Sequence, residues 1–399
     1  MTKKTPAAEG GAPVRDRFLP FARPCIEETD IDLVVETLRS GWLTVGPKTH
    51  EFQRRVAEYV GVESAAALSS CTAGLHLAMV ALGIGEGDEV IVPTIDFVSG
   101  ANTICHLGAK PVLVDVDPVT LCVTPEILKS AITDRTRLLM PVHFAGHPCD
   151  MDGIMDLARA RGIKVLGDAA HAIGADIGGR RIGSIADVTS FSFYVTKGIT
   201  TGEGGAVTST DPDLTARIAL LGLHGMSSDA WKRYSDRGPW YYEVHEAGYK
   251  YNMNDIQAAL GLAQLDRVDG FRERRREIAD AFTAAFATNP LVSPPAQFEG
   301  GHHAWHLYPI RIDTDSLAID RDRFIHQLLE EGIGVSVHFI PVHYHPYYRK
   351  TLGHAPGDFP VAEAYFERAI SLPIYPSMTD EDVGDVIEAV NRLTTFHRR

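Results

Sequence analysis

The sequence between Ser190 and Gly205 reads SFSFYVTKGITTGEGG. Its beginning is a short apolar run typical of a buried strand, and its end is a glycine-rich turn. Lys197 lies between the two, just past the end of the predicted strand. Most lysines are solvated surface residues, but this position favours a lysine that the wall of a compact site desolvates.

Desolvation matters because a free lysine titrates near about 10.4 and is a poor nucleophile at neutral pH. Burial or a nearby cation has to lower its pKa before the amine can attack a carbonyl group. The natural use of such a lysine is Schiff-base chemistry with an aldehyde cofactor. Lys197 is therefore the first candidate catalytic residue.

A second motif, VLGDAAH at Val165–His171, is an apolar strand that ends in the carboxylate of Asp168. The carboxyl edge of the sheet is where α/β folds place their ligands. A carboxylate there can keep a pyridine nitrogen protonated, so that the ring accepts electrons during transamination. Taken alone, Asp168 could equally cap a helix, and His171 could be a packed or capping histidine.

A third motif, LSSCTAGL at Leu68–Leu75, places small hydroxyl residues at the start of a predicted helix. Free backbone N–H groups and the helix dipole make such a start a phosphate site, to which serine and threonine hydroxyls add donors. Serine and threonine begin many helices, so this motif gains weight only beside the other two.

Short apolar runs alternate with helical patterns from about residue 30 to 210, which predicts an α/β fold with a mostly parallel sheet flanked by helices. The predicted strands are Ala65–Leu68, Glu89–Pro93, Pro111–Val116, Leu138–Phe144, Lys164–Gly167, Val188–Phe193 and Gly205–Thr208. We divide the chain into a flexible tail (1–17), a large domain (18–265) and a smaller C-terminal α+β domain (266–399).

In the small domain the pattern predicts strands at Trp305–Ile312 and Val335–Phe339. It also predicts helices at Phe271–Phe286, Asp320–Glu331, Val361–Ile370 and Asp380–Leu393, the last with a capping box of Thr379 and Asp382. The arginine-rich run Arg272–Arg276 is interpreted as a solvated helix face.

The composition of the 399-residue chain restricts its partners and its compartment. A formal charge of −14 disfavours binding to nucleic acid or an anionic membrane surface, and no apolar run is long enough to span a bilayer. The five scattered cysteines suggest neither a disulfide framework nor a metal site. We expect a cytoplasmic protein, with residues 1–17 lacking the apolar core of a secretory signal.

Together, the phosphate cradle, the acidic strand end and the lysine resemble, in that order, the DegT/DnrJ/EryC1/StrS family of sugar aminotransferases. The resemblance runs from about Phe21 to the last helix. Further matching segments are GWLTVGP (Gly41–Pro47), PTIDFV (Pro93–Val98), His224–Gly225 and GYKYNMNDIQAA (Gly248–Ala259).

The resemblance implies the fold-type I architecture, with a seven-stranded sheet, and a homodimer with shared active sites at the subunit interface. It implies pyridoxal 5'-phosphate (PLP), cycling with pyridoxamine 5'-phosphate (PMP), as the cofactor. The implied cofactor contacts are a ring-stacking Phe97, phosphate contacts from Cys71, Thr72, Ala73 and Ser192, and His171 near the phenolic oxygen. Asp168 and Lys197 keep the roles argued above, and Trp42 and Thr44 would lie at the substrate mouth.

Two positions depart from the common pattern of the family. Many members have an Asn-x-Arg pair where this chain has Lys250 and Asn252, which changes the cofactor-phosphate contact expected from the neighbouring subunit. A branch of the family that acts on amino-arabinose precursors resembles this version. Asp96 stands where threonine or serine is more usual, so it could alter substrate contacts or simply cap a turn.

The segment HFIPVHYHP (His338–Pro346) resembles the part that the family brings to the substrate side of its site. His338 and His343 are candidates for binding sugar hydroxyls or diphosphate. The cations and aromatics of residues 231–242 suit a nucleotide, although an ordinary exposed loop is nearly as good a reading.

The reaction implied is a ping-pong transamination from an amino acid, L-glutamate by resemblance, to a nucleotide-linked keto-sugar, for which a UDP-4-keto sugar is favoured. One alternative is a glutamine-dependent aminotransferase for scyllo-inosose-type cyclitols. Another is a regulator that keeps the fold without turnover. Related sugar dehydratases with a reductive role carry histidine in place of the lysine, so Lys197 favours amino transfer.

Overall fold

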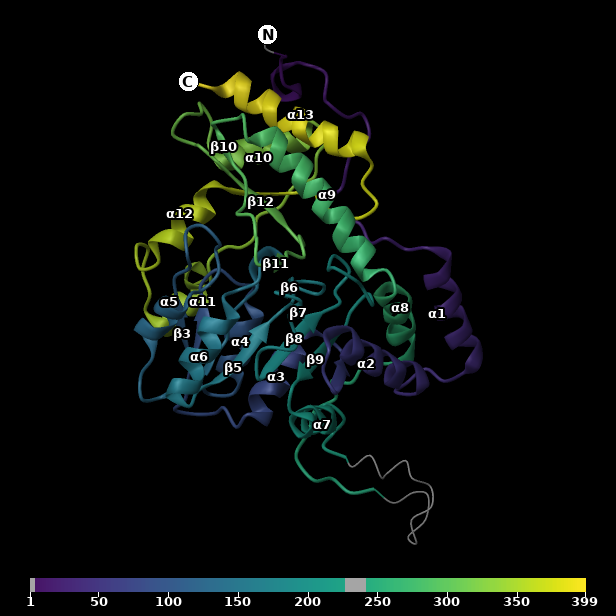
Figure 1. The fold of residues 1–399 in the computed structure, drawn as a ribbon. Helices are drawn as coiled ribbons and strands as arrows, with labels where there is room; N and C mark the ends of the chain where they lie inside the picture. The colour runs from purple at the N-terminus through teal and green to yellow at the C-terminus, as the bar shows by residue number, and fades with distance from the viewer. Residues whose placement is uncertain (1–3, 227–241) are drawn as a thin grey trace.

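A computed structural model describes residues 4–226 and 242–399 of the protein. Figure 1 shows a part built around a central sheet, a second part that carries both chain ends, and helix α9 running between them. The helices are α1 (Glu28–Ser40), α2 (Pro47–Val60), α3 (Cys71–Ala81), α4 (Ser99–His106), α5 (Pro125–Ala131), α6 (Met151–Arg161), α7 (Pro212–Leu221), α8 (Asp255–Leu265), α9 (Val268–Phe286), α10 (Arg321–Glu330), α11 (Pro346–Leu352), α12 (Pro360–Arg368) and α13 (Asp380–His397). Short 3-10 turns are η1 (Ala7–Glu9), η2 (Phe144–Gly146) and η4 (Val342–Tyr344).

The central sheet has seven strands in the order β1-β9-β8-β5-β4-β2-β3. They are β1 (Ser64–Leu68), β9 (Gly205–Ser209), β8 (Val188–Ser192), β5 (Lys164–Asp168), β4 (Thr136–Leu139), β2 (Glu89–Pro93) and β3 (Lys110–Val114). Only β9 pairs antiparallel with its neighbours, and the other pairs in this sheet are parallel. The predicted α/β fold with a mostly parallel seven-stranded sheet is confirmed.

The boundaries of these strands follow their burial, and most lie within a residue or two of the prediction. The clearest difference is β4, which was expected to reach Phe144 but ends at Leu139. Beyond it the chain keeps only an isolated bridge from Val142 to Asp168 and then turns through η2, where Ala145 has φ 58°. The apolar run continues past the strand because these residues are buried under the C-terminal part.

The carboxyl ends of β1, β2, β5 and β8 lie at the same edge of the sheet, because these strands are parallel to one another. Helix α3 starts just after β1, and its first turn is capped by Ser70, whose hydroxyl accepts a hydrogen bond from Ala73 N–H at 3.0 Å. Gly205, the first residue of β9, approaches the same turn so closely that a Cβ there would lie 2.4 Å from the Ser70 carbonyl carbon. This glycine fixes α3 against the sheet edge.

The C-terminal part is built on a three-stranded antiparallel sheet in the order β10-β12-β13, with strands β10 (Val292–Ser293), β12 (Tyr308–Ile312) and β13 (Ala369–Leu372). A third small sheet joins β11 (Gly301–His302), β6 (Asp176–Ile177) and β7 (Arg180–Arg181). The predicted capping box of Thr379 and Asp382 begins α13.

Three predicted elements of this part differ from the observed ones. The helix expected over Val361–Ile370 ends at Arg368, and its last two residues begin β13. The segment Val335–Phe339 is not a strand and keeps a single bridge, between Ser336 and Ser371. The strand expected from Trp305 starts only at Tyr308, because Trp305 adopts φ 48° and forms a turn.

Helix α9 contributes to both hydrophobic cores. Val268 and Phe271 pack into the core of the large sheet, whereas Ile278 and Phe282 pack into that of the C-terminal part. The interpretation of its arginine run as a solvated face is wrong for Arg275, which is only 4% exposed. The Arg275 guanidinium donates a 3.4 Å hydrogen bond to the carbonyl of Gly198, in the turn that follows Lys197.

Residues 4–17, predicted as a flexible tail, contact the C-terminal part. The buried carboxylate of Glu331 accepts hydrogen bonds from Ala7 N–H at 2.9 Å and Val14 N–H at 2.8 Å. Arg15 forms ion pairs with Asp382 and Asp385 of α13. No local pattern predicts these contacts, since the partners are distant in the chain. Among the helices of the described ranges, none is long and apolar enough to cross a bilayer.

Candidate active site

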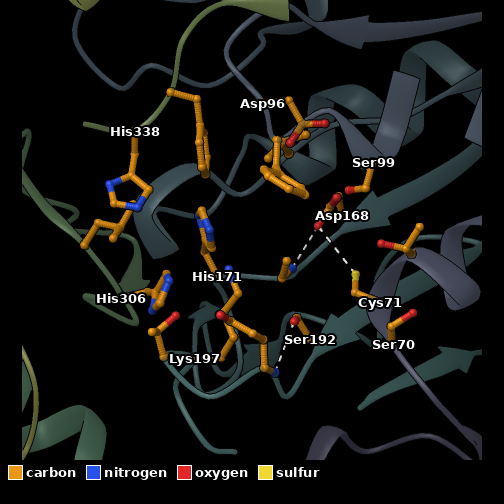
Figure 2. Close-up of a pocket in the computed structure, with 18 of the residues that line it drawn as sticks. Ser70, Cys71, Asp96, Ser99, Asp168, His171, Ser192, Lys197, His306 and His338 are labelled. Atoms are coloured by element: carbon orange, nitrogen blue, oxygen red, sulfur yellow. Dashed lines mark hydrogen bonds between the residues drawn. The ribbon is translucent and has the colours of Figure 1, made fainter. Parts of the chain in front are cut away.

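A cavity of about 470 Å³ opens at the carboxyl edge of the central sheet, beneath the C-terminal part. Its volume lies in the range of pockets that hold cofactors and small ligands. Figure 2 shows Cys71, Asp96 and Asp168 on one side of this space and the imidazoles of His171, His306 and His338 on the other.

Asp168 is the last residue of β5 and is 3% exposed. Its Oδ1 accepts a 2.9 Å hydrogen bond from Ala170 N–H and lies 4.0 Å from the Cys71 sulfur. Burial raises the pKa of Asp168, while the Ala170 N–H and the charge of Lys197 act in the opposite direction. The carboxyl group is thus held in place and presents its second oxygen to the cavity.

Lys197 lies in the turn after β8, where its own N–H donates to the Tyr194 carbonyl at 2.9 Å. Its side chain lines the cavity. Burial lowers the pKa of Lys197 to about 8, even though the charges of Asp168 and other acidic groups favour the protonated form. A substantial fraction of the amine is therefore neutral near physiological pH, as nucleophilic and proton-transfer chemistry requires.

The start of α3 forms the floor of the cavity together with the end of β8. Thr72 and Ser192 both line it, and Cys71 is held by a 3.3 Å contact between its sulfur and the Ser190 hydroxyl. The Ala73 N–H is already bonded to the Ser70 hydroxyl, so the donors left to a ligand are those ahead of it in the turn. Burial and the charge of Asp168 raise the pKa of Cys71, which stays a thiol.

Asp96 is a second buried carboxyl group of the cavity, 4% exposed, and its Oδ2 has no hydrogen-bond partner among the described residues. Burial, followed by the charge of Asp168, raises the pKa of Asp96 well above its usual range. Of the two acids, Asp96 is therefore the one that keeps its proton.

Aromatic rings border the upper part of the cavity. Phe97 is 58% exposed in the single chain, and its ring centroid lies 6.1 Å from that of Phe339. His171 stacks on Phe339 at 5.8 Å. His338 stacks on Phe21 at 5.4 Å, and its Nδ1 lies 2.9 Å from the Ser371 hydroxyl.

The other candidate substrate residue of the same segment, His343, lies outside the cavity lining. Its side chain is 1% exposed, with Nδ1 2.7 Å from the Thr94 hydroxyl and Nε2 3.1 Å from a Glu363 oxygen. Both ring nitrogens are thus occupied by the protein. The position does not fit the predicted contact with substrate, and it fits a structural link between the segment after β2, which contains Thr94, and helix α12, which contains Glu363.

Besides His343 and Ala73, which do not line the cavity, four predicted site residues lie away from it in the same chain. Trp42 and Asn252 line a separate hollow of about 650 Å³, and Thr44 and Lys250 are exposed. Lys250 donates a 2.5 Å hydrogen bond to the Asn252 side chain. Of the predicted nucleotide loop, residues 231–241 lie outside the described residues.

The cavity also includes groups that the sequence did not single out. His306 lines it from the C-terminal part, beside His171, and Arg275 supports the lysine turn from behind. The sequence alone does not single out either residue, because His306 is one of 17 histidines and Arg275 lies in a run of charged residues.

Comparisons with known proteins agree with this geometry. The model of the DegT/DnrJ/EryC1/StrS aminotransferase family matches residues 24–391. The chain is 52% identical over 380 residues to the spore coat polysaccharide biosynthesis protein SpsC of Bacillus subtilis, covering 95% of this chain and 98% of the relative. It is 51% identical over 385 residues to the uncharacterized protein MJ1066 of Methanocaldococcus jannaschii, covering 96% and 100%.

Solved structures are similar over nearly the whole fold. Spr1654 from Streptococcus pneumoniae in its PMP form has a TM-score of 0.89 at 37% identity, covering 95% of this chain and 99% of that one. It is also known in a PLP form. PseC of Helicobacter pylori, an aminotransferase involved in pseudoaminic acid biosynthesis, has a TM-score of 0.88 at 28% identity, covering 96% and 100%. The chain therefore belongs to the DegT/DnrJ/EryC1/StrS family and is a PLP-dependent aminotransferase.

Proposed function

We propose that the protein transfers the amino group of L-glutamate to a nucleotide-linked keto-sugar, a UDP-4-keto sugar in the first instance, by a ping-pong mechanism. The observation that carries the proposal is the shared cavity of Asp168 and Lys197 at the edge of the sheet. The 52% identity to a spore coat polysaccharide biosynthesis protein supports a sugar as the amino acceptor.

The residues of the cavity fit PLP. Thr72, Ser192 and the free N–H groups at the start of α3 form a cradle for a phosphate. The Asp168 carboxyl group suits a protonated ring nitrogen, and the exposed face of Phe97 suits a flat ring. The buried Nδ1 of His171 has no hydrogen-bond partner among the described residues, which fits a polar ring substituent beside it.

When bound, PLP supplies an electron sink that lets the carbon bearing the amine lose its proton. Lys197 then moves that proton as general base and general acid, and its lowered pKa suits both tasks near neutral pH. Asp168 keeps the ring-nitrogen proton in place. The aromatic rings and His171 restrict water and orient the substrate, and His338 is the histidine of its segment available to a sugar hydroxyl.

A homodimer with shared active sites belongs to the same proposal. Trp42 and Leu43 are 42% and 44% exposed, and the hollow beside them is lined mainly by apolar side chains. Exposed apolar surface of this kind marks association sites. Trp42, Thr44, Lys250 and Asn252 lie outside the cavity of their own chain, so in the proposed dimer they serve the cavity of the second copy.

The first test is an absorbance spectrum of the PLP-loaded protein before and after addition of L-glutamate. Conversion of the lysine-linked cofactor to PMP supports glutamate as the donor, and keto-sugars can then be screened against the PMP form. Conversion by L-glutamine alone would favour the cyclitol alternative. A protein that binds PLP but responds to neither donor would contradict the proposal. It would support the alternative of a regulator that keeps the fold without turnover.

The dimer is tested by light scattering on the wild type and on Trp42→Glu, with Tyr347→Glu as a control at another exposed aromatic position. Mixing inactive Lys197→Ala chains with Asn252→Ala chains tests shared sites. Activity above that of either parent supports residues supplied in trans. A wild-type monomer would contradict the dimer while leaving the cofactor chemistry intact.

A further inference from the structure

His306 comes into the cavity from a rigid turn between β11 and β12. The turn is fixed by Trp305, whose N–H donates to His303 Nδ1 at 2.8 Å and whose ring stacks on that of His303 at 3.9 Å. Trp305 also has φ 48°, a left-handed conformation that an L-residue adopts only when its surroundings require it. The turn thus holds the following side chain in one direction, toward Lys197 and His171 (Figure 2).

The imidazoles of His306 and His171 form a pair with unused polar atoms. Each residue is 6% exposed, and the ring centroids lie 4.4 Å apart. Within the described part of the chain, neither Nδ1 has a hydrogen-bond partner. Buried polar atoms are rarely left unpaired, so such an atom in a cavity indicates a ligand that satisfies it, and with His171 Nδ1 assigned to the cofactor ring the atom left over is His306 Nδ1.

The charges around Lys197 are divided between two sides of the cavity. Asp168 and the protonated Asp96 lie on one side, where the charge of Asp168 raises the pKa of Lys197. The imidazoles lie on the other, where burial and then neighbouring cationic groups including Lys197 lower the pKa of His171 and His306. Neutral imidazoles can donate an N–H to an anion without the repulsion that the acidic side would impose.

An amino donor has to place its amine where the Lys197 amine lies, and its α-carboxylate is attached to the carbon that bears this amine. The carboxylate therefore lies beside Lys197, on one of the two sides. Among the described lining residues Lys197 is the one lysine and none is an arginine, so no guanidinium of the same chain is there to receive it. The imidazole side is the one compatible with an anion.

We propose that His306, through its unpaired Nδ1 beside the ring of His171, binds the α-carboxylate of the amino donor. This inference rests on the proposed function, because it requires that an amino acid be the donor. It assigns His306 to donor recognition in the first half-reaction, and it leaves the sugar to other residues.

The test compares His306→Phe, which keeps a flat ring for stacking, with His306→Gln, which keeps an N–H donor. Both are loaded with PLP and titrated with α-methylglutamate, which binds but has no α-proton to lose, while the cofactor spectrum reports binding. We expect the dissociation constant to rise about 10- to 100-fold in the Phe variant, as expected for loss of a hydrogen bond to a charged group, and less in the Gln variant. The kcat/KM of the half-reaction with L-glutamate should follow the same order.

A donor without an α-carboxylate provides the matched control. With 4-aminobutyrate the wild type and His306→Phe should differ far less than they do with glutamate, and PLP affinity should be equal in all three proteins. A Phe variant that binds α-methylglutamate as well as the wild type, or better than the Gln variant, would show that the ring serves packing and would overturn the inference alone. A wild type that responds to no amino donor would overturn the proposed function and this inference together.

Discussion

The two walls of the cavity are built by different means. The first, the strand-end wall, consists of residues that end a strand of the central sheet (Asp168 and Ser192), begin α3 (Cys71), or lie in the segments that follow β2 and β8 (Asp96 and Lys197). The second, the C-terminal wall, consists of His306, His338 and Phe339, which lie in connecting segments. A sheet edge fixes its residues through the ladder of backbone hydrogen bonds, whereas connecting segments tolerate change. The comparison indicates that reaction chemistry resides on the first wall and substrate choice on the second.

The largest effect is expected from Lys197→Ala, which removes the base of the strand-end wall. General acid-base catalysis contributes about 10²–10⁴-fold, and in the proposed function the lysine also holds the cofactor covalently, so turnover should fall at least about 10⁴-fold. PLP should still bind through the phosphate cradle and Asp168. Steady-state assays and equilibrium dialysis of PLP measure the two properties.

Lys164→Ala is the control, because Lys164 is an exposed lysine at the opposite end of β5, paired with Asp187 at 2.9 Å. It should keep full turnover. Equal losses in the two variants would mean that any lysine near this sheet matters, and the role of Lys197 would be refuted.

Asp168→Asn should lower kcat about 10- to 100-fold, the range expected for a hydrogen bond between charged groups. The amide fills the same space and can still contact the ring nitrogen, but it cannot hold a proton there. Rapid-mixing measurement of the glutamate half-reaction tests this. An unchanged rate in the Asn variant would show that Asp168 does not take part in the reaction, and it would contradict the assignment of the chemistry to the strand-end wall.

The pH dependence of PLP capture by the apoenzyme should have its midpoint near pH 8. Below that pH the Lys197 ammonium predominates and cannot attack, and above it the neutral amine does, so the rate rises with pH. Because the Asp168 charge favours the ammonium, Asp168→Asn should displace the midpoint to lower pH. A midpoint that moves upward, or that is the same in both proteins, would contradict this electrostatic account.

His343→Phe should affect stability and not chemistry, since His343 lies on neither wall. The change removes the partner of the buried Thr94 hydroxyl and one hydrogen bond to Glu363, whose carboxylate still accepts from the Gly357 and Phe359 N–H groups, so the free energy of unfolding should fall by about 1–3 kcal/mol. Urea titration measures this, and donor kinetics should match the wild type. A normal unfolding curve combined with a raised KM for substrate would restore His343 as a binding residue.

The central sheet was predictable because its strands are buried on both faces and read as continuous apolar runs. The same reasoning failed at Val335–Phe339, a half-buried segment of alternating apolar and polar residues that keeps a single bridge and does not join the ladder as a strand. It failed also at Trp305, whose left-handed backbone is imposed by its stacking on His303. A local sequence pattern indicates which residues are buried, but it does not indicate which segment they pair with.

The sequence allowed residues of the strand-end wall to be predicted more readily than those of the C-terminal wall. Asp168 and Lys197 were readable because strand ends have a fixed place in an α/β fold. His306 was not, since its significance comes from a ring that precedes it by more than a hundred residues in the chain. Arg275 looked like one charge in an exposed run, and only the packing of α9 against both cores reveals it as buried.

Helix α9 also limits how the chain can be recombined with its relatives. A crossover at the predicted boundary near residue 266 would replace Val268 and Phe271, which pack beneath the native sheet, with the residues of the relative. It would also replace Arg275, which lies behind the lysine turn. A crossover within α9, after Arg275 and before Ile278, would leave Arg275 with the sheet and exchange the second core, together with the later residues, such as Leu307 and Tyr365, that pack into the first core. In a library of chimeras, the middle of this helix is thus the preferred crossover point for combining a new C-terminal wall with an unchanged strand-end wall.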